Sequence, residues 1–316
     1  MVAIESAKDS RPQPNKETIR IERNRTMKIL LTGKNGQLAQ EMQKSRPAHI
    51  ELVALDRQDL DISNSEQVMQ AIAEHKPAAV INAAAYTAVD KAESERESVY
   101  AVNATGPENL AAACKEFDVR LIHISTDFVF DGQSSTPYHE QDAVRPLGVY
   151  GESKAAGEAA IQALLPQAVI LRTAWVYSAH GANFANTMLR LMNERDQLGV
   201  VADQIGTPTS TRTLAEAIYA LIEKPEAACI YHCTDAGAAS WYDFAVAIYE
   251  EGKEVGLLPV EKQVQIKPIG TSDYPTPAAR PAYSVLDKSR LVNELGIELQ
   301  HWRKALRQVL REKATL

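Results

Sequence analysis

Five short apolar runs, separated by stretches with helical periodicity, place the strongest constraint on the fold of this chain. The runs are Lys28–Thr32, Ile50–Leu55, Ala79–Asn82, Val119–Ser125 and Ala168–Leu171. A chain that alternates strands with helices predicts parallel strands, because each helix carries the chain back to the same edge of the sheet. Right-handed crossovers then place helices on both faces. We therefore expect an α/β fold with a doubly wound parallel sheet.

This order of elements is typical of a Rossmann domain, which we assign to residues 27–172 as an NAD(P)-binding unit. After Arg172 the order of elements becomes less regular, with helical stripes near residues 183–195, 211–223 and 240–251. They predict a smaller substrate-binding lobe over residues 173–316, interleaved with the Rossmann core. Residues 1–26 are polar and lack the apolar segment of a secretory signal. We expect them to be a disordered extension or a mis-assigned start.

The bulk properties argue against several classes of function. A net charge of −7 disfavours general nucleic-acid binding, and no apolar stretch is long enough to span a bilayer. Three cysteines give no disulfide framework, and a cytoplasmic location is the default expectation. Cys229, His232 and Cys233 lie close together, but no second ligand pair follows at zinc spacing. We expect Ile230–Cys233 to be a buried strand and predict no metal site.

A glycine-containing turn, G-x-x-G-x-x-A, follows the first apolar run and is formed by Gly33, Gly36 and Ala39. The first glycine permits a sharp turn, and the second lets the backbone approach a pyrophosphate. The small Ala39, where a third glycine is usual, still allows close packing of helix on strand. Phosphate oxygens would lie at the positive end of the following helix. The turn, including Asn35, is therefore predicted to bind NADPH or NADH.

Other candidate cofactor ligands follow the second and third runs. Asp56 ends the second run and can accept hydrogen bonds from an adenosine ribose, whereas its neighbour Arg57 can meet a 2′-phosphate, so the choice between NADH and NADPH stays open. Asp61 and Ile62 are expected under the adenine, with helix capping as the alternative for Asp61. The third run leads into three small residues at the cofactor edge of the sheet: Ala83, Ala84 and Ala85.

Tyr150 and Lys154 are four residues apart on a predicted helix and so lie on one face. We expect the Lys154 ammonium to lower the pKa of the Tyr150 phenol and so to make it a usable proton donor near neutral pH. Thr126 ends the fourth run and can orient a carbonyl oxygen opposite the phenol, with Ser125 as the alternative hydroxyl. The arrangement predicts hydride transfer at a carbonyl or alcohol carbon. An isolated Y-x-x-x-K pair is more often an exposed helical pair, but its place after the turn and Thr126 favours the catalytic interpretation.

These motifs resemble the extended short-chain dehydrogenase/reductase superfamily and, within it, the family of dTDP-4-dehydrorhamnose reductases. The resemblance covers about residues 27–312. Its most specific segments are NAAAYTAVDKAES at 82–94, STDFVFDG at 125–132, VYGESKAAGE at 149–158, LRTAWVYS at 171–178, DQIGTPT at 203–209 and YPTPAARP at 274–281. It implies reduction of dTDP-4-dehydro-β-L-rhamnose to dTDP-β-L-rhamnose by NADPH or NADH.

The resemblance also implies roles for individual residues. Thr126, Tyr150 and Lys154 would be catalytic, and Asp127 and Trp175 would contact the deoxysugar. Arg280 is a candidate partner for a phosphate, with a surface ion pair as the alternative. The cofactor would be lined by Gly36, Gln37, Leu38, Asp61, Ile62, Ala85, Tyr86 and Thr87.

Some relatives bind Mg²⁺ through glutamates at a dimer interface. Glu41 matches one such position, but Thr211-Arg212-Thr213 stands where a carboxylate is needed. We therefore do not expect a Mg²⁺-bridged dimer, and a homodimer of another kind stays open.

Two other functions are consistent with parts of this pattern. One is another nucleotide-sugar enzyme of the superfamily, an epimerase or a dehydratase. Dehydratases follow Thr-Asp with a glutamate, where this chain has Phe128. The other is a non-catalytic regulatory subunit, like that of methionine adenosyltransferase, which need not keep the three reacting residues.

Overall fold

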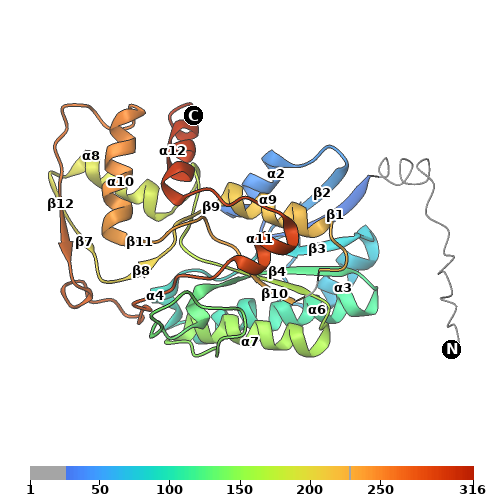
Figure 1. The fold of residues 1–316 in the computed structure, drawn as a ribbon. Coiled ribbons are helices and arrows are strands. Elements are labelled where there is room, and N and C mark those ends of the chain that lie inside the picture. Colours follow the sequence, from blue (N-terminus) through green and yellow to red (C-terminus); the bar gives the residue numbers. More distant parts are fainter. Residues whose placement is uncertain (1–25, 228) are drawn as a thin grey trace, which may run out of the picture.

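The computed structural model describes residues 26–227 and 229–316, so the predicted extension over residues 1–26 lies outside the described residues apart from Thr26. A six-stranded sheet lies between layers of helices in one half of the molecule (Figure 1). Its strands pair in the order β10-β5-β4-β3-β1-β2. Every pairing in it is parallel. The strands are β1 (Met27–Thr32), β2 (Ile50–Leu55), β3 (Ala79–Asn82), β4 (Arg120–Thr126), β5 (Val169–Thr173) and β10 (Cys229–His232). The predicted doubly wound parallel sheet is confirmed.

Each face of the sheet is covered by helices, because successive strand residues point to opposite faces. On one face, Ile29 and Leu31 are fully buried under α2 (Gln37–Ser45), α9 (Thr211–Ile222) and α11 (Ser289–Leu295). On the other face, Leu30 is fully buried under helices α3 (Ser65–His75), α6 (Gly106–Glu116) and α7 (Val149–Leu164). The strands β1, β3, β4 and β5 are buried on both sides, as their continuous apolar sequence predicts, whereas the edge strand β2 is buried only at Ile50.

A second hydrophobic core lies beside the sheet and is built from the later part of the chain. Phe244, Ile248 and Leu306 are fully buried in it. Its helices are α8 (Phe184–Glu194), α10 (Trp241–Glu254) and α12 (Trp302–Lys313), next to the paired strands β7 (Gln197–Val201) and β12 (Gln265–Ile269). Two short strand pairs are also present in this later part of the chain. One joins β6 (Val176–Tyr177) to β9 (Thr209–Ser210), and the other joins β8 (Ile205–Gly206) to β11 (Ala239–Ser240). The chain leaves the sheet after β5, returns through α9 and β10, and then leaves again for α10 (Figure 1).

The connection between β3 and β4 is helical but irregular. It consists of α4 (Val89–Ala92), α5 (Arg96–Tyr100), a π-helical turn (Ala101–Thr105) and α6. The extra residue of the π turn directs Asn103 inward, where it is buried. Within the described ranges, no helix has the length and apolar character needed to cross a membrane.

Candidate active site

A cavity of about 640 Å³ lies at the carboxyl ends of β3, β4 and β5, the edge at which doubly wound sheets bind ligands. Side chains from the sheet, from α7 and from the second core all reach it. Of the predicted site residues, its lining includes Asn35, Gly36, Gln37, Leu38, Ala83, Ala85, Thr87, Thr126, Asp127, Tyr150, Lys154, Trp175 and Arg280.

The turn after β1 has a conformation that only glycine adopts readily. Gly33 has a φ of 77°, and a Cβ atom on it would lie 2.9 Å from the backbone of Ala83 and Ala84. The N–H of Gly36 donates to the carbonyl of Gly33 at 2.8 Å and directly precedes α2. Ala39 is fully buried in the first turn of that helix. The turn therefore brings the N-terminus of α2 close to the end of the sheet and leaves its own backbone open to the approach of a phosphate group.

Gln37 joins this turn to the second core. Its side-chain amide donates to the carbonyl of Val176 at 3.1 Å, and its oxygen accepts from Ser178 and Asn183, each at 3.3 Å. The predicted role of Gln37 in lining the cofactor is thus combined with a structural link between the two cores.

Asp56 and Asp61, two of the predicted adenosine ligands, lie outside the cavity lining and are bound locally. Asp56 accepts from the N–H groups of Gln58 and Asp59, and the first of these hydrogen bonds is the largest cause of its lowered pKa. Asp61 accepts from the hydroxyl and the N–H of Ser63. Neither carboxylate points at the reacting end of the site.

Four more predicted residues are not among those that line the cavity: Gly33, Ile62, Ala84 and Tyr86. Asn103 fixes the loop after β3, because it accepts from the N–H of Tyr86 at 2.9 Å and donates to the Tyr86 carbonyl at 3.0 Å. It also donates to the hydroxyl of Ser153 on α7 at 3.1 Å. The loop and the Tyr150 helix are therefore held together by one buried amide.

The end of β4 brings the predicted reacting groups together. The hydroxyl of Thr126 donates to Asp127 at 3.0 Å, and both residues lie close enough to the Tyr150 phenol to influence its pKa. The edge of the Phe128 ring faces the Tyr150 ring, with centroids 5.5 Å apart. Ser125, the alternative hydroxyl, instead donates to the buried carboxylate of Glu158 at 2.5 Å. Thr126 is thus the strand-end hydroxyl that faces the phenol.

One electrostatic prediction is wrong. The pKa of Tyr150 is raised to about 12, because burial outweighs the opposing hydrogen bond with Thr126 and the Asp127 carboxylate adds to the increase. Lys154 does not lower it. The Lys154 nitrogen lies 2.7 Å from the carbonyl oxygen of Ile124 and 3.2 Å from Nε2 of His123, so it points toward β4.

Asp127 is almost completely buried, with 2% of its surface exposed. Burial raises its pKa to about 6, although hydrogen bonds with Ser284 and Thr126 act in the opposite direction. A carboxyl group kept in such surroundings, beside a phenol and a threonine hydroxyl, is unfavourable for stability and is typical of a functional site.

Trp175, predicted to stack on a sugar, is stacked on another indole. The rings of Trp175 and Trp241 are 3.5 Å apart at their centroids and nearly parallel, with an interplanar angle of 6°. Trp175 has a φ of 48°, which is strained for a tryptophan. A Cβ on Gly206 would lie 2.6 Å from the Trp175 ring, so this glycine is required for the close approach. The sequence reasoning missed Trp241, although the capping box at Ser240 marks it as the first residue of α10.

Arg280 forms an ion pair with Asp90, the alternative expected from sequence. Its two terminal nitrogens lie 3.1 and 2.8 Å from the two oxygens of the Asp90 carboxylate. The guanidinium nevertheless lines the main cavity. It also lines a second cavity of about 470 Å³, which is bordered further by Arg195 and Tyr274. Trp241 and Arg280 are common to both cavities.

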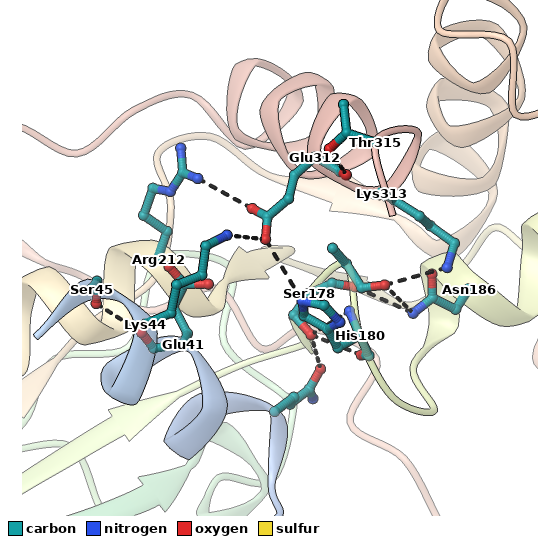
Figure 2. A network of polar contacts seen from close by, with 12 residues as sticks. Glu41, Lys44, Ser45, Ser178, His180, Asn186, Arg212, Glu312, Lys313 and Thr315 are labelled. Atoms are coloured by element: carbon teal, nitrogen blue, oxygen red, sulfur yellow. Dashed lines mark hydrogen bonds and ion pairs between the residues drawn. The ribbon is translucent and has the colours of Figure 1, made fainter.

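The residues that correspond to a metal site do not fit a divalent cation. Glu312 of α12 is paired with Lys44 and with Arg212, whose nitrogen lies 3.3 Å from it, and His180 lies 3.8 Å away (Figure 2). Glu41 is buried beside this cluster, and burial together with the charge of Glu312 raises its pKa. Protein cations thus occupy the space between the carboxylates. Among the described residues, no group of three or more His, Cys, Asp or Glu side chains could hold a metal ion.

Comparison with known proteins finds relatives along nearly the whole described chain. A family model described as "RmlD substrate binding domain" matches residues 27–315. The dTDP-4-dehydrorhamnose reductase of Aggregatibacter actinomycetemcomitans is 43% identical over 289 residues, which cover 89% of this chain and 98% of that protein.

Solved structures match equally well. A crystal structure of a dTDP-4-dehydrorhamnose reductase from Clostridium acetobutylicum is 43% identical, with a TM-score of 0.85, and the match covers 90% of this chain and 98% of that one. A dTDP-4-dehydrorhamnose reductase from Bacillus anthracis, crystallised in complex with NADP, is 36% identical, also with a TM-score of 0.85, and the match covers 91% and 99%.

Proposed function

This chain belongs to the dTDP-4-dehydrorhamnose reductase family, and on that premise we propose how its side chains carry out the reduction. It is an NAD(P)H-dependent oxidoreductase of dTDP-rhamnose biosynthesis that acts on a nucleotide sugar. The reaction takes dTDP-4-dehydro-β-L-rhamnose to dTDP-β-L-rhamnose. The convergence of Thr126, Tyr150 and Lys154 in one cavity, next to the glycine turn, is the observation that carries the assignment of residues.

The cofactor is proposed to lie along the turn at Gly33 and Gly36, where a side chain on Gly33 would collide with the backbone of Ala83 and Ala84, directly after β3. The N-terminus of α2 points its free N–H groups into the cavity and suits a pyrophosphate. When bound, NAD(P)H supplies the hydride. Asp56 and Arg57 lie at the far end of this path, so the preference for NADPH or NADH is assigned to the loop after β2.

Tyr150 is proposed to donate the proton to the sugar oxygen. With its pKa raised to about 12, the phenol is fully protonated at neutral pH and therefore able to donate. Thr126 holds the same oxygen by a hydrogen bond, which strengthens as negative charge develops on it. Lys154, one helical turn from Tyr150, is proposed to bind the nicotinamide ribose.

The substrate is proposed to span both cavities. The deoxysugar would lie near Asp127 and the Trp175–Trp241 pair, since indole faces suit the apolar face of a sugar. The nucleoside diphosphate would extend past Arg280 into the second cavity, where Arg195 and Arg280 supply positive charge.

The other two functions receive less support. Phe128 places an aromatic edge where a dehydratase needs a carboxylate, and it cannot exchange a proton. A regulatory subunit has no requirement for a threonine, a tyrosine and a lysine in one cavity.

A coupled assay tests the proposed function. The 4-keto sugar is generated from its precursor by the upstream enzymes, and the loss of NADPH and of NADH absorbance is followed separately. We expect turnover that depends on the nucleotide sugar, with dTDP-β-L-rhamnose as the product by mass spectrometry and NMR. Absence of turnover with both cofactors would contradict the proposal.

A further inference from the structure

A buried row of polar side chains crosses three strands beneath the cavity and ends at Lys154. The hydroxyl of Thr32 lies 2.7 Å from Oδ1 of Asn82. Nδ2 of Asn82 lies 2.9 Å from Nδ1 of His123, and Nε2 of His123 lies 3.2 Å from the Lys154 nitrogen. All four side chains are at most 2% exposed. The hydrogen bonds in such a row are constrained, because water cannot replace a partner.

A backbone N–H fixes the direction of this row. The N–H of Ala84 is shared between Oδ1 of Asn82, at 3.2 Å, and the hydroxyl oxygen of Thr32, at 3.3 Å. A backbone N–H can only donate, so the oxygen of the Asn82 amide must be on this side. The NH₂ group of Asn82 then faces His123 and donates to Nδ1. A neutral imidazole that accepts at Nδ1 carries its hydrogen on Nε2.

That hydrogen on Nε2 points at Lys154. An ammonium group has three donors and no acceptor, so it cannot pair with an N–H group. A neutral amine has one lone pair and can accept from His123 while it donates to the carbonyl of Ile124 at 2.7 Å. The geometry therefore favours the neutral form of Lys154.

We propose that Asn82 and His123 are positioning residues that destabilise the ammonium form of Lys154 relative to the neutral amine, so that loss of this ammonium sets the upper pH limit of the reductase. The inference rests on the proposed role of Lys154 in binding the nicotinamide ribose, and it takes the ammonium, with its three donors, as the form that binds. Activity and cofactor affinity then fall as pH rises through the pKa of Lys154.

The electrostatic surroundings agree with this assignment. Burial lowers the pKa of Lys154 to about 8 and lowers that of His123 well below its usual value. Glu158, one turn further along α7, raises the pKa of Lys154, but its carboxylate is already paired with Arg172 at 2.6 Å. Tyr150, one turn earlier, is neutral over this pH range.

Asn82→Asp should reverse the direction of the hydrogen bonds between position 82, His123 and Lys154, with almost no change in side-chain shape. A carboxylate at position 82 still accepts from Thr32 and Ala84, but it also accepts from Nδ1–H of His123. Nε2 then becomes an acceptor and favours the Lys154 ammonium. We expect the upper pH limit of kcat/KM, and of NADPH affinity measured by fluorescence, to move up by at least about one pH unit. Thr32→Val is the shape-matched control: it leaves the Ala84 N–H in place and should move the limit by much less.

A second measurement needs no substitution. Long-range ¹H–¹⁵N NMR of the intact protein distinguishes the two tautomers of His123, and we expect the Nε2–H form between pH 6 and pH 9, roughly the range around the pKa of Lys154. An Nδ1–H form overturns the proposal, as does an Asn82→Asp variant whose pH limits equal those of the wild type. Failure of the proposed function would be recognised separately, as absence of sugar reduction by a wild type that still binds NADPH with the expected pH dependence.

Discussion

The hydroxyl of Thr126 donates a hydrogen bond to the carboxylate of Asp127 at 3.0 Å, so the side chains of these two consecutive residues lie together on the same side of the chain at the end of β4. Successive residues of a regular strand would point to opposite faces. The chain avoids this by entering a 3₁₀ turn at Asp127–Val129, whose N-cap is Thr126. The turn is thus the local device that points both a hydroxyl and a carboxyl group toward Tyr150.

Asp127→Asn should stabilise the protein at neutral pH and impair the reaction. The pKa of Asp127 is raised from 3.8 to about 6, so the folded state holds this proton more tightly than the unfolded state does. The ionised Asp127 carboxylate therefore lowers the free energy of unfolding. This destabilisation is absent below the pKa of an unfolded aspartate, grows as pH rises, and is complete above about pH 6. Removing the charge should add about 1–3 kcal/mol to the free energy of unfolding at pH 8 and little at pH 4. Chemical denaturation at both pH values measures this difference.

Asp131→Asn is the control for that experiment. The pKa of Asp131 is lowered, chiefly by its hydrogen bond from Tyr138, so this carboxylate stabilises the fold above its unfolded pKa. Its variant should lose stability at pH 8 and keep full turnover. If both substitutions lowered the free energy of unfolding at pH 8 by the same amount, burial of the ionised Asp127 carboxylate would have no energetic cost.

Tyr150→Phe should remove most of the turnover, with kcat lower by about 10²–10⁴-fold, because a general acid contributes a factor of this size. NADPH should bind with nearly unchanged affinity, since the ring and its contact with Phe128 remain. Tyr100→Phe is a matched control on α5, where the hydroxyl bonds Glu152 outside the cavity lining. Turnover near the wild-type rate in Tyr150→Phe would contradict the role of the phenol.

Gly33→Ala should be far more harmful than Gly181→Ala, although both glycines have positive φ angles of 77° and 70°. Both substitutions carry the strain of a left-handed alanine, about 1–2 kcal/mol. A Cβ at Gly33 also meets the backbone of Ala83 and Ala84 at 2.9 Å, whereas nothing lies within 4 Å of one at Gly181. We expect an additional loss of about 1–3 kcal/mol and weakened NADPH binding for Gly33→Ala alone. Thermal unfolding with and without NADPH measures both effects.

The thermal stability and oligomeric state of the wild type should not respond to EDTA or to millimolar Mg²⁺, because Arg212 and Lys44 already neutralise Glu312. Arg212→Glu should lower the unfolding temperature in EDTA, since it places a third carboxylate beside Glu312 and Glu41. Mg²⁺ should restore part of that loss, because oxygen ligands suit this cation.

Arg212→Gln removes the charge without adding a carboxylate and should show no response to Mg²⁺. Saturable stabilisation of the wild type by Mg²⁺ would mean that the cation displaces the arginine. Light scattering of each variant, with and without Mg²⁺, would reveal a change of assembly.

The sheet and the main reacting side chains could be predicted because both depend on local pattern. Apolar runs identify strands, and polar residues at their carboxyl ends, such as Thr126, must meet at one edge. The direction of Lys154 could not be predicted in this way. It is decided by His123, a buried residue on a neighbouring strand whose partner depends on long-range register.

Residues of the second core were harder to place for the same reason. Trp241 reaches the cavity only because Gly206 and Trp175 lie against each other, and these three residues are far apart in sequence. The contact of Asp56 and Asp61 with the adenosine stays a prediction. In the structure Asp56 accepts from the N–H of Gln58 and from the Asn35 amide at 3.3 Å, and Asp61 accepts from Ser63. Short polar side chains in turns often bond their own backbone, and a motif does not reveal this.

The return of the chain through α9 and β10 sets a limit on how this protein can be divided. A fragment that stops after β5 would keep the turn at Gly33. It would, however, leave the backbone hydrogen-bonding groups of Val169–Thr173 unpaired where β10 normally binds, and it would lack Leu214, Ile218 and Leu221 of α9, which cover the sheet. Such an exposed strand invites self-association. An excised cofactor module should therefore be insoluble on its own, and any split version of this enzyme should be cut within the second core instead.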